Sequence, residues 1–117
     1  MGKRIAVKRG EIWLVNLDPT IGHEIRKSRP GIIIQNDIGN KYSPITIIAP
    51  VTSSIEKIYP IEVLLTKKNS GLKKESKAVL NQIRAIDKKR LIRKIGRLKN
   101  SAIGEVNEAI KISLGLY

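Results

Sequence analysis

The fold class of this 117-residue chain is decided by the stretch Ile45-Thr46-Ile47-Ile48-Ala49-Pro50-Val51. The stretch is short, almost continuously apolar and rich in β-branched residues, which is typical of a strand buried on both faces. Pro30 to Gln35 has the same character, and a turn is expected between the two at Asp37-Ile38-Gly39-Asn40. These two runs therefore predict neighbouring central strands of a small barrel.

Further strand patterns flank this pair on both sides. Glu11 to Leu17 combines β-branched and aromatic residues and stops at Asp18-Pro19, which is a turn signal. Pro60 to Leu65 and Lys77 to Ile83 supply two more short strands. At least five strands are therefore expected in the first two-thirds of the chain.

The last third of the chain changes to helical spacing. Asp87 to Leu98 is predicted to be a helix, because its apolar residues recur at helical intervals and Asp87 suits an N-cap. A second helix is predicted from Ser101 onward, where one apolar stripe contains Ile103, Val106, Ile110 and Leu114. Strands followed by a packed C-terminal helix indicate an α+β, mainly β fold, and residues 1–117 are expected to form one domain.

The positive charge is concentrated in one segment. The chain carries a net charge of +13, and residues 67–99 hold thirteen Lys and Arg against the two acids Glu75 and Asp87. A basic patch of this kind attracts a polyanion, so a nucleic acid or an acidic protein partner is indicated. A lysine-rich solvated surface is the alternative interpretation.

Several kinds of chemistry lack the residues that they need. Cysteine is absent, and His23 is the only histidine, so a histidine pair within one chain is excluded. No group of acids has metal-ligand spacing, and we expect neither a metal nor another cofactor. No apolar stretch approaches the roughly 20 residues that span a membrane, so a soluble, cytoplasmic protein is expected. If the chain cuts a phosphodiester, the substrate should be RNA, which supplies its own 2′-hydroxyl nucleophile.

Eight motifs follow one another along almost the whole chain: Arg9-Gly10-Glu11-Ile12-Trp13, Asp18-Pro19-Thr20-Ile21-Gly22-His23-Glu24, Arg29-Pro30, Ile33-Ile34-Gln35-Asn36-Asp37, Ile38-Gly39-Asn40-Lys41-Tyr42-Ser43-Pro44, Ala49-Pro50-Val51-Thr52-Ser53, Gln82-Ile83-Arg84-Ala85-Ile86-Asp87 and Val106-Asn107-Glu108-Ala109-Ile110-Lys111-Ile112-Ser113-Leu114. In this order and at this spacing they resemble the MazF/PemK/Kid family of toxin endoribonucleases. A single dipeptide such as Arg29-Pro30 would not be specific, but the ordered set is.

The resemblance implies a small SH3-like (MazF/CcdB-type) barrel with a C-terminal helix, paired as a homodimer that binds single-stranded RNA along its interface. It implies the toxin of a type II toxin–antitoxin system, a sequence-specific and metal-independent endoribonuclease, or mRNA interferase. Cleavage would leave a 2′,3′-cyclic phosphate and a 5′-hydroxyl. An acidic antitoxin protein is the implied inhibitor.

The resemblance carries the catalytic residues over to Arg29, Thr52 and Glu24. A guanidinium at the two non-bridging oxygens stabilises the transition state of 2′-hydroxyl attack, and the threonine hydroxyl can donate a further hydrogen bond. Glu24 either orients Arg29 or accepts the 2′-hydroxyl proton. Outside the motifs, ordinary roles would be a surface ion pair for Arg29, a strand-forming residue for Thr52 and a solvated loop acid for Glu24.

The residues expected to contact RNA are Ser53, Asn36, Gln82, Lys27 and Tyr42. The first three are candidate readers of base edges, and Tyr42 is a candidate for stacking on a base. Trp13 is expected in the core and His23 in a loop. Asn81 stands where relatives often carry glutamate, which bears on base selection and not on the chemistry.

Two other functions stay open at this point. A toxin of the same fold could poison a protein such as DNA gyrase and cleave nothing, or a non-catalytic basic barrel could coat RNA or DNA. The set Arg29, Thr52 and Glu24 argues against the first. Intact RNA with a gel shift would support the second.

Overall fold

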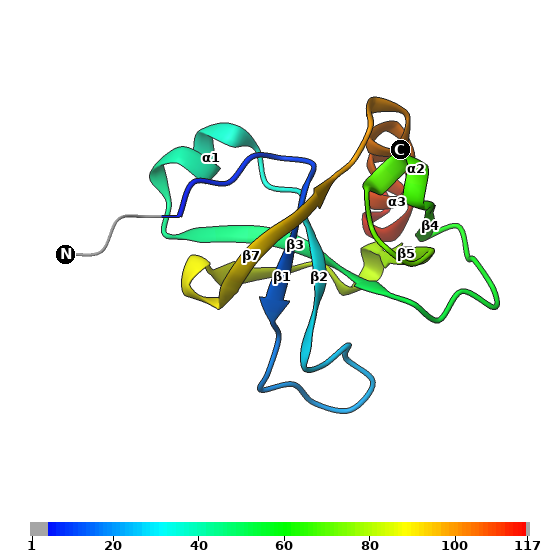
Figure 1. Ribbon diagram of the computed structural model, residues 1–117, viewed down its shortest axis with the longest axis horizontal. Helices are drawn as coiled ribbons and strands as arrows, with labels where there is room; N and C mark the ends of the chain where they lie inside the picture. Colours follow the sequence, from blue (N-terminus) through cyan, green and yellow to red (C-terminus); the bar gives the residue numbers. More distant parts are fainter. Residues whose placement is uncertain (1–4, 117) are drawn as a thin grey trace.

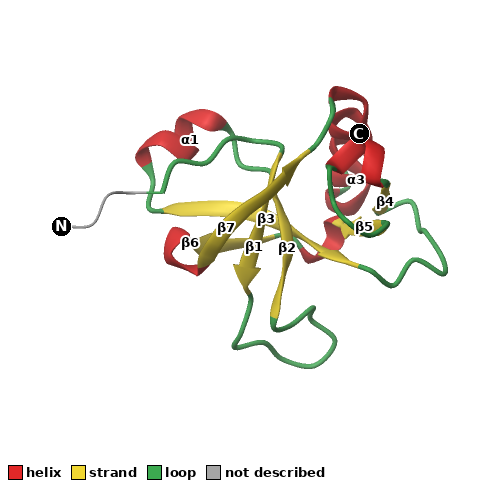
Figure 2. Ribbon diagram, in the orientation of Figure 1, coloured by secondary structure: helices red, strands yellow, loops and turns green. Residues whose placement is uncertain are grey.

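The computed structural model describes residues 5–116 as a twisted antiparallel sheet with helices around it (Figure 1). In chain order the elements are β1 (Glu11–Asn16), β2 (Ser28–Ile33), α1 (Asp37–Tyr42), β3 (Ile45–Thr52), β4 (Glu62–Leu65), α2 (Lys67–Ser70), β5 (Ser76–Val79), the 3₁₀ turn η1 (Leu80–Gln82), β6 (Arg84–Asp87), the 3₁₀ turn η2 (Lys88–Arg90), β7 (Leu91–Arg97) and α3 (Asn100–Leu114). Figure 2 shows α2 and α3 gathered at one end of the sheet and α1 at the other.

Strand β3 joins the parts of the sheet because it pairs along both edges. One edge pairs with β2, while the other pairs with β6 through Ile45–Ile48 and with β5 through Val51 and Thr52. The strand order is β4-β5-β3-β2-β1-β7, with β6 beside β3. Within residues 5–116, β7 pairs with β1 and no strand pairing joins it to β4 or β6, so the fold is a mainly β antiparallel sheet with a C-terminal helix.

Apolar side chains pack on both faces of the central strands, as the continuous apolar runs predicted. In β2, Ile32 belongs to a core cluster that also contains Val106 and Ala109 of α3, while Ile33 belongs to a second cluster on the other face. In β3, Ala49 and Ile48 divide between the same two clusters. Successive residues of a strand point to opposite faces, so two-sided burial requires apolar residues without alternation.

The predicted C-terminal helix is confirmed. Helix α3 buries Ala102, Val106 and Ala109 against the sheet and ends at Gly115, whose φ of 68° is the left-handed conformation that favours glycine. Among residues 5–116, no helix is long and apolar enough to cross a membrane.

The predicted helix from Asp87 to Leu98 is wrong, because this segment forms η2 and β7. Leu91 lies in strand register with Val15 of β1, and Ile92 is half exposed, although helical spacing would have placed both on one apolar face. The Asp87 side chain does accept a hydrogen bond from the Lys89 N–H at 2.8 Å, but it caps only a single 3₁₀ turn. Asp87 therefore acts as a cap, as predicted, but the residues after the 3₁₀ turn form a strand. Pairing with β1 outweighs the helical spacing of the apolar residues.

Two other elements differ from the prediction. The turn expected at Asp37–Asn40 is the start of helix α1, which Asn36 caps by accepting the Gly39 N–H at 2.8 Å. The strand expected over Lys77–Ile83 ends at Val79, where the chain enters η1. Trp13 is partly buried against the second core cluster, in agreement with its predicted core role.

Candidate active site at the ends of β2 and β3

A pocket of about 450 Å³ opens where β2 begins and β3 ends. Its lining residues are Arg29, Pro30, Val51, Thr52, Ser53, Gly71, Leu72, Lys73, Lys74, Ser76, Arg93 and Ile95. Four of these residues are basic and none is acidic, so the pocket suits an anionic ligand. It also contains two of the three predicted catalytic residues.

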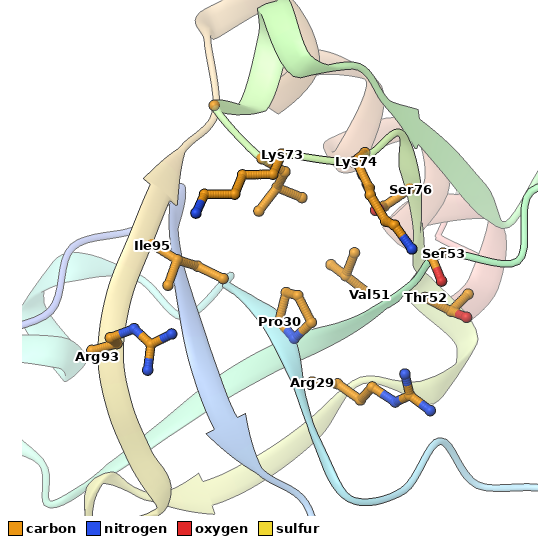
Figure 3. A pocket seen from close by; sticks show the side chains of 12 residues that line it. Arg29, Pro30, Val51, Thr52, Ser53, Lys73, Lys74, Ser76, Arg93 and Ile95 are labelled. Carbon is orange, nitrogen blue, oxygen red and sulfur yellow. Dashed lines mark hydrogen bonds between the residues drawn. The ribbon is translucent and has the colours of Figure 1, made fainter.

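Strand register brings Arg29 and Thr52 together. Gly31 pairs with Pro50 in the last pair between β2 and β3, and Arg29 and Thr52 each lie two residues beyond that pair on their strands. On its other edge, Thr52 pairs with Lys77 of β5. Both side chains therefore line the same pocket, each from a different strand (Figure 3).

The Arg29 side chain is exposed and keeps most of its donors free. Its Nε donates to the Arg26 carbonyl oxygen at 3.3 Å, and within residues 5–116 its two terminal nitrogens have no partner. A guanidinium offers its donors as a planar fork that matches two phosphate oxygens. Arg29 can therefore bind a phosphate without breaking a strong contact.

The Thr52 hydroxyl is arranged as a donor. Its Oγ1 accepts the Ser54 N–H at 3.3 Å, which occupies one lone pair and leaves the hydroxyl hydrogen available. Ser53 follows on the exposed chain and also lines the pocket. Arg29, Thr52 and Ser53 thus form one group of donors.

Three predicted residues belong to the loop between β1 and β2 or to its support. The exposed Glu24 carboxylate accepts the Ile21 N–H within this loop and does not line the pocket, so the structure does not bring it to Arg29. Lys27 has a φ of 67°, and its N–H donates to the Asp18 carboxylate at 3.1 Å. Gln82 accepts the Ile25 N–H at 2.8 Å and so fastens the loop to η1.

Asn36 and Tyr42 lie at the opposite end of the sheet. Asn36 follows β2 and caps α1, whereas Arg29 lies near the start of the same strand. The strand from Arg29 to Ile33 alone separates the two by about 13 Å. Tyr42 ends α1 with its side chain exposed, and the Lys41 amine lies 5.4 Å from its ring centroid.

The acids with shifted pKa values hold the fold and lie outside the pocket. Burial raises the pKa of Glu11, but hydrogen bonds from Lys94, the Lys8 N–H and Trp13 outweigh burial, and the pKa lies below its ordinary value. A hydrogen bond from the Arg9 N–H lowers the pKa of Asp37. Within residues 5–116, no three His, Asp or Glu side chains gather as a metal site.

Sequence reasoning did not single out Lys73, Lys74, Arg93 or Ser76 as site residues. The available signal was the excess of basic residues in 67–99, which contains all three cations. That signal could not tell which of the thirteen bases face the pocket. The choice depends on where the segment after α2 lies relative to β7.

Comparison with known proteins agrees with this arrangement. Residues 8–114 match the family described as PemK-like, MazF-like toxin of type II toxin–antitoxin system. The chain is 47% identical to the endoribonuclease MazF of Staphylococcus epidermidis over 94% of this chain and 92% of that protein. It is 43% identical to the endoribonuclease EndoA of Bacillus subtilis strain 168, covering 94% of this chain and 96% of that one.

Solved structures show the same fold. The crystal structure of MazF from Deinococcus radiodurans has a TM-score of 0.83 at 23% identity, covering 96% of this chain and 99% of that one. A mycobacterial endoribonuclease solved in complex with its cognate antitoxin has a TM-score of 0.81 at 19% identity, covering 96% and 98%. From the family match and the identity to its relatives, this chain belongs to the PemK-like, MazF-like toxins of type II toxin–antitoxin systems.

Proposed function

We propose that this toxin cleaves single-stranded RNA at a short motif without a metal ion, leaving a 2′,3′-cyclic phosphate and a 5′-hydroxyl. The endoribonuclease class follows from family membership and from 43% and 47% identity to two endoribonucleases over nearly the whole chain. The proposed mechanism is supported chiefly by Arg29 and Thr52, which line one pocket whose lining contains four bases and no acid.

In this mechanism the ribose 2′-oxygen attacks the adjacent phosphorus while the bond from phosphorus to the 5′-oxygen breaks. Negative charge grows on the two non-bridging oxygens, where the free Arg29 fork and the Thr52 hydroxyl donate hydrogen bonds. Arg29 acts as a donor and not as a base, because a guanidinium stays protonated in proteins and has no acceptor. It can also supply the proton that the leaving 5′-oxygen takes up.

Glu24 is the proposed group that accepts the 2′-hydroxyl proton or orients Arg29. Its carboxylate binds the Ile21 N–H in this structure, so either role requires the loop to turn Glu24 toward Arg29 when RNA binds. Replacing Glu24 with glutamine distinguishes the roles. Loss of the acidic limb of the pH–rate profile supports proton transfer, and a pH-independent loss supports orientation.

The proposed RNA contacts differ in their distance from the cut. Ser53 lies at the pocket, and Lys27 and Gln82 shape the neighbouring loop. Asn36 and Tyr42 lie at the far end of the sheet, so one chain can place them only several nucleotides from the scissile bond. We therefore expect Ser53 to affect the choice of base at the cut more than Asn36 does.

We also propose a homodimer, an SH3-like barrel curvature of the sheet, and an acidic antitoxin that binds this +13 chain in the cytoplasm. The mycobacterial relative solved with its cognate antitoxin supports the partner. Exposed apolar residues near the end of the chain, Ile112, Leu114 and Leu116, support contact with a second subunit.

The decisive experiment incubates the purified chain with a mixed RNA in excess EDTA. Discrete fragments with 5′-hydroxyl ends are expected, and a substrate with 2′-deoxyribose at the scissile position should stay intact. A requirement for added Mg²⁺ or Zn²⁺, or cleavage of the deoxy substrate, would contradict the mechanism. Intact RNA that is shifted in a gel would favour the non-catalytic alternative, and inhibited DNA gyrase would favour the protein-poisoning one.

A further inference from the structure

The pocket has an apolar floor between two polar walls (Figure 3). Pro30, Val51, Leu72 and Ile95 supply its apolar part. One wall contains the proposed catalytic residues Arg29 and Thr52. Ser53, Ser76 and Lys74 lie on the same wall. The other wall contains Lys73 and Arg93, on the side of β7.

The charged groups of Lys73 and Arg93 do not contribute contacts that hold the fold. Both side chains are exposed, and within residues 5–116 neither has a hydrogen-bond or ion-pair partner. Lys94, which follows Arg93 in β7, differs, because its amine lies 2.9 Å from a Glu11 carboxylate oxygen. The pocket lining also contains no acid that would neutralise Lys73 or Arg93.

The spacing of the two walls is fixed by the fold. Arg93 lies in register with Leu14, and Leu14 with Pro30, so two strand spacings, about 10 Å, separate Arg93 from β2. On the same side, β7 contacts α2 closely: a Cβ added to Gly96 would lie 2.5 Å from the Ser70 carbonyl oxygen. This contact sets the position of the segment that carries Lys73.

On the basis of the proposed function, we propose that Lys73 and Arg93 form a second phosphate subsite for a non-scissile phosphate of the same RNA strand. The two walls are carried by strands about 10 Å apart, so each wall can bind a phosphate of its own. A ribose or base between the two phosphates rests on the apolar floor. The volume of about 450 Å³ is in the range of small-ligand sites.

The subsite would set which way the strand crosses the pocket. Phosphate contacts fix register and orientation without reading sequence. With one phosphate at Arg29 and another at Arg93, the nucleotide between them is held over Pro30 and Val51. Lys73 and Arg93 are therefore binding residues that select the register of the cut.

The test measures RNA binding by fluorescence anisotropy with an oligonucleotide whose scissile ribose is 2′-O-methylated. The variants are Arg93→Gln and Lys73→Gln, and the matched control is Arg97→Gln, an exposed arginine of β7 outside the pocket lining. We expect each pocket variant to weaken Kd roughly five- to tenfold and to reduce the salt slope by about 0.7, and the control to do neither.

A second set of oligonucleotides carries one uncharged methylphosphonate at each flanking linkage in turn. One methylphosphonate position should weaken RNA binding by the wild type to the Kd of Arg93→Gln. The same oligonucleotide should not weaken binding by Arg93→Gln any further, because the contact is already missing in that variant. Additive losses at every linkage, or losses no larger than those of Arg97→Gln, overturn the subsite. So does unchanged RNA affinity with weakened binding of an acidic peptide, which would assign the wall to a protein partner.

This test is separate from the proposed function, because it does not need cleavage. A wild type that binds the RNA but cuts no substrate contradicts the proposed function, and the Kd values still decide the subsite.

Discussion

In the proposed mechanism, Arg29 acts through the shape of its side chain as well as its charge. We predict that Arg29→Ala lowers the cleavage rate by roughly a hundredfold or more, and that Arg29→Lys restores little of it, because an ammonium cannot hold two phosphate oxygens in one plane. The fold should persist in both, since Arg29 is exposed and makes one hydrogen bond of 3.3 Å. Initial rates on a short RNA, with circular dichroism as the control for folding, measure this. Near wild-type activity of the lysine variant would reject the two-oxygen contact.

Thr52 offers a matched pair of substitutions. Thr52→Val keeps the side-chain shape but removes the hydroxyl, and we expect a loss in kcat of about a hundredfold. Thr52→Ser keeps the donor and should retain most of the rate. The comparison of kcat between the two variants separates donation from packing, and equal losses in both would point to packing.

Glu11 makes the stability of the chain depend on pH. Its pKa in the folded chain lies below the ordinary value of 4.5, so its contribution is fully present above that pH and is lost as the pH falls through the folded pKa. Glu11→Gln should therefore have a lower Tm than the wild type at pH 7. The difference in Tm between the two chains should shrink as the pH falls below 4.5. Thermal unfolding of both chains between pH 3 and 7 tests the sign. A difference in Tm that stays constant with pH would contradict it.

Polar residues were the hardest to assign from sequence. Arg29 and Thr52 were predicted from motifs, and the sheet brings them to one pocket. Asn36 and Gln82 were expected to read bases, yet their side-chain oxygens accept backbone N–H groups that hold α1 and the β1–β2 loop. A side-chain amide uses the same oxygen and nitrogen to cap a helix and to bind a nucleobase. Only the fold shows which partners these atoms have.

At the scale of elements, the contact between β7 and α2 depends on Gly96. We predict that Gly96→Ala destabilises the chain by about 1–3 kcal/mol, because the new Cβ would lie 2.5 Å from the Ser70 carbonyl oxygen, and the segment with Lys73 must move. Gly104→Ala in α3 is the matched control, because its Cβ meets nothing within 4 Å and alanine favours a helix by about 1 kcal/mol. Urea unfolding should therefore give shifts of opposite sign. A Gly96→Ala chain as stable as wild type would show that α2 can move away from β7 at little cost in free energy.

Elements were predicted well where burial set the pattern and least well in β7. Strands β1, β2 and β3 followed from apolar runs, and α3 from its stripe. The apolar spacing of this segment fits a helix, yet the chain forms a bulged strand in which Leu91 packs in the second core cluster and Ile95 against the first. Only pairing with β1 decides between the two, and this pairing joins residues distant in sequence.

For the whole molecule, the basic segment divides into structural and free charges. Of its thirteen bases, five have side-chain partners that hold the fold: Lys77, Arg84, Lys88, Arg90 and Lys94. Arg84, for example, donates to the Leu17 carbonyl oxygen at 3.0 Å and supports the end of β1. The sequence shows that this segment is positively charged. It does not show which of its bases have partners within the fold and which are free to bind RNA.

We predict that cleavage slows steeply with salt and that Arg84→Gln leaves the salt slope of kcat/KM unchanged. The slope reports phosphates neutralised, and Arg84 is engaged with the backbone. The same variant should lose about 1 kcal/mol of stability with the lost hydrogen bond. Cleavage rates from low to high salt, together with Tm, test both halves. A shallower slope in Arg84→Gln would place this arginine on the RNA.

The double pairing of β3 restricts how toxins of this architecture can diversify. Inserting one residue within Ile45–Thr52 would exchange the sides to which Ile48 and Ala49 point, and would misalign three partner strands at once. Changes of length should therefore accumulate in the connections at residues 17–27 and 53–61, which lead into β2 and out of β3 beside the pocket residues Arg29 and Thr52 and tolerate new lengths. New RNA motifs would then arise by remodelling these loops around an unaltered reaction centre.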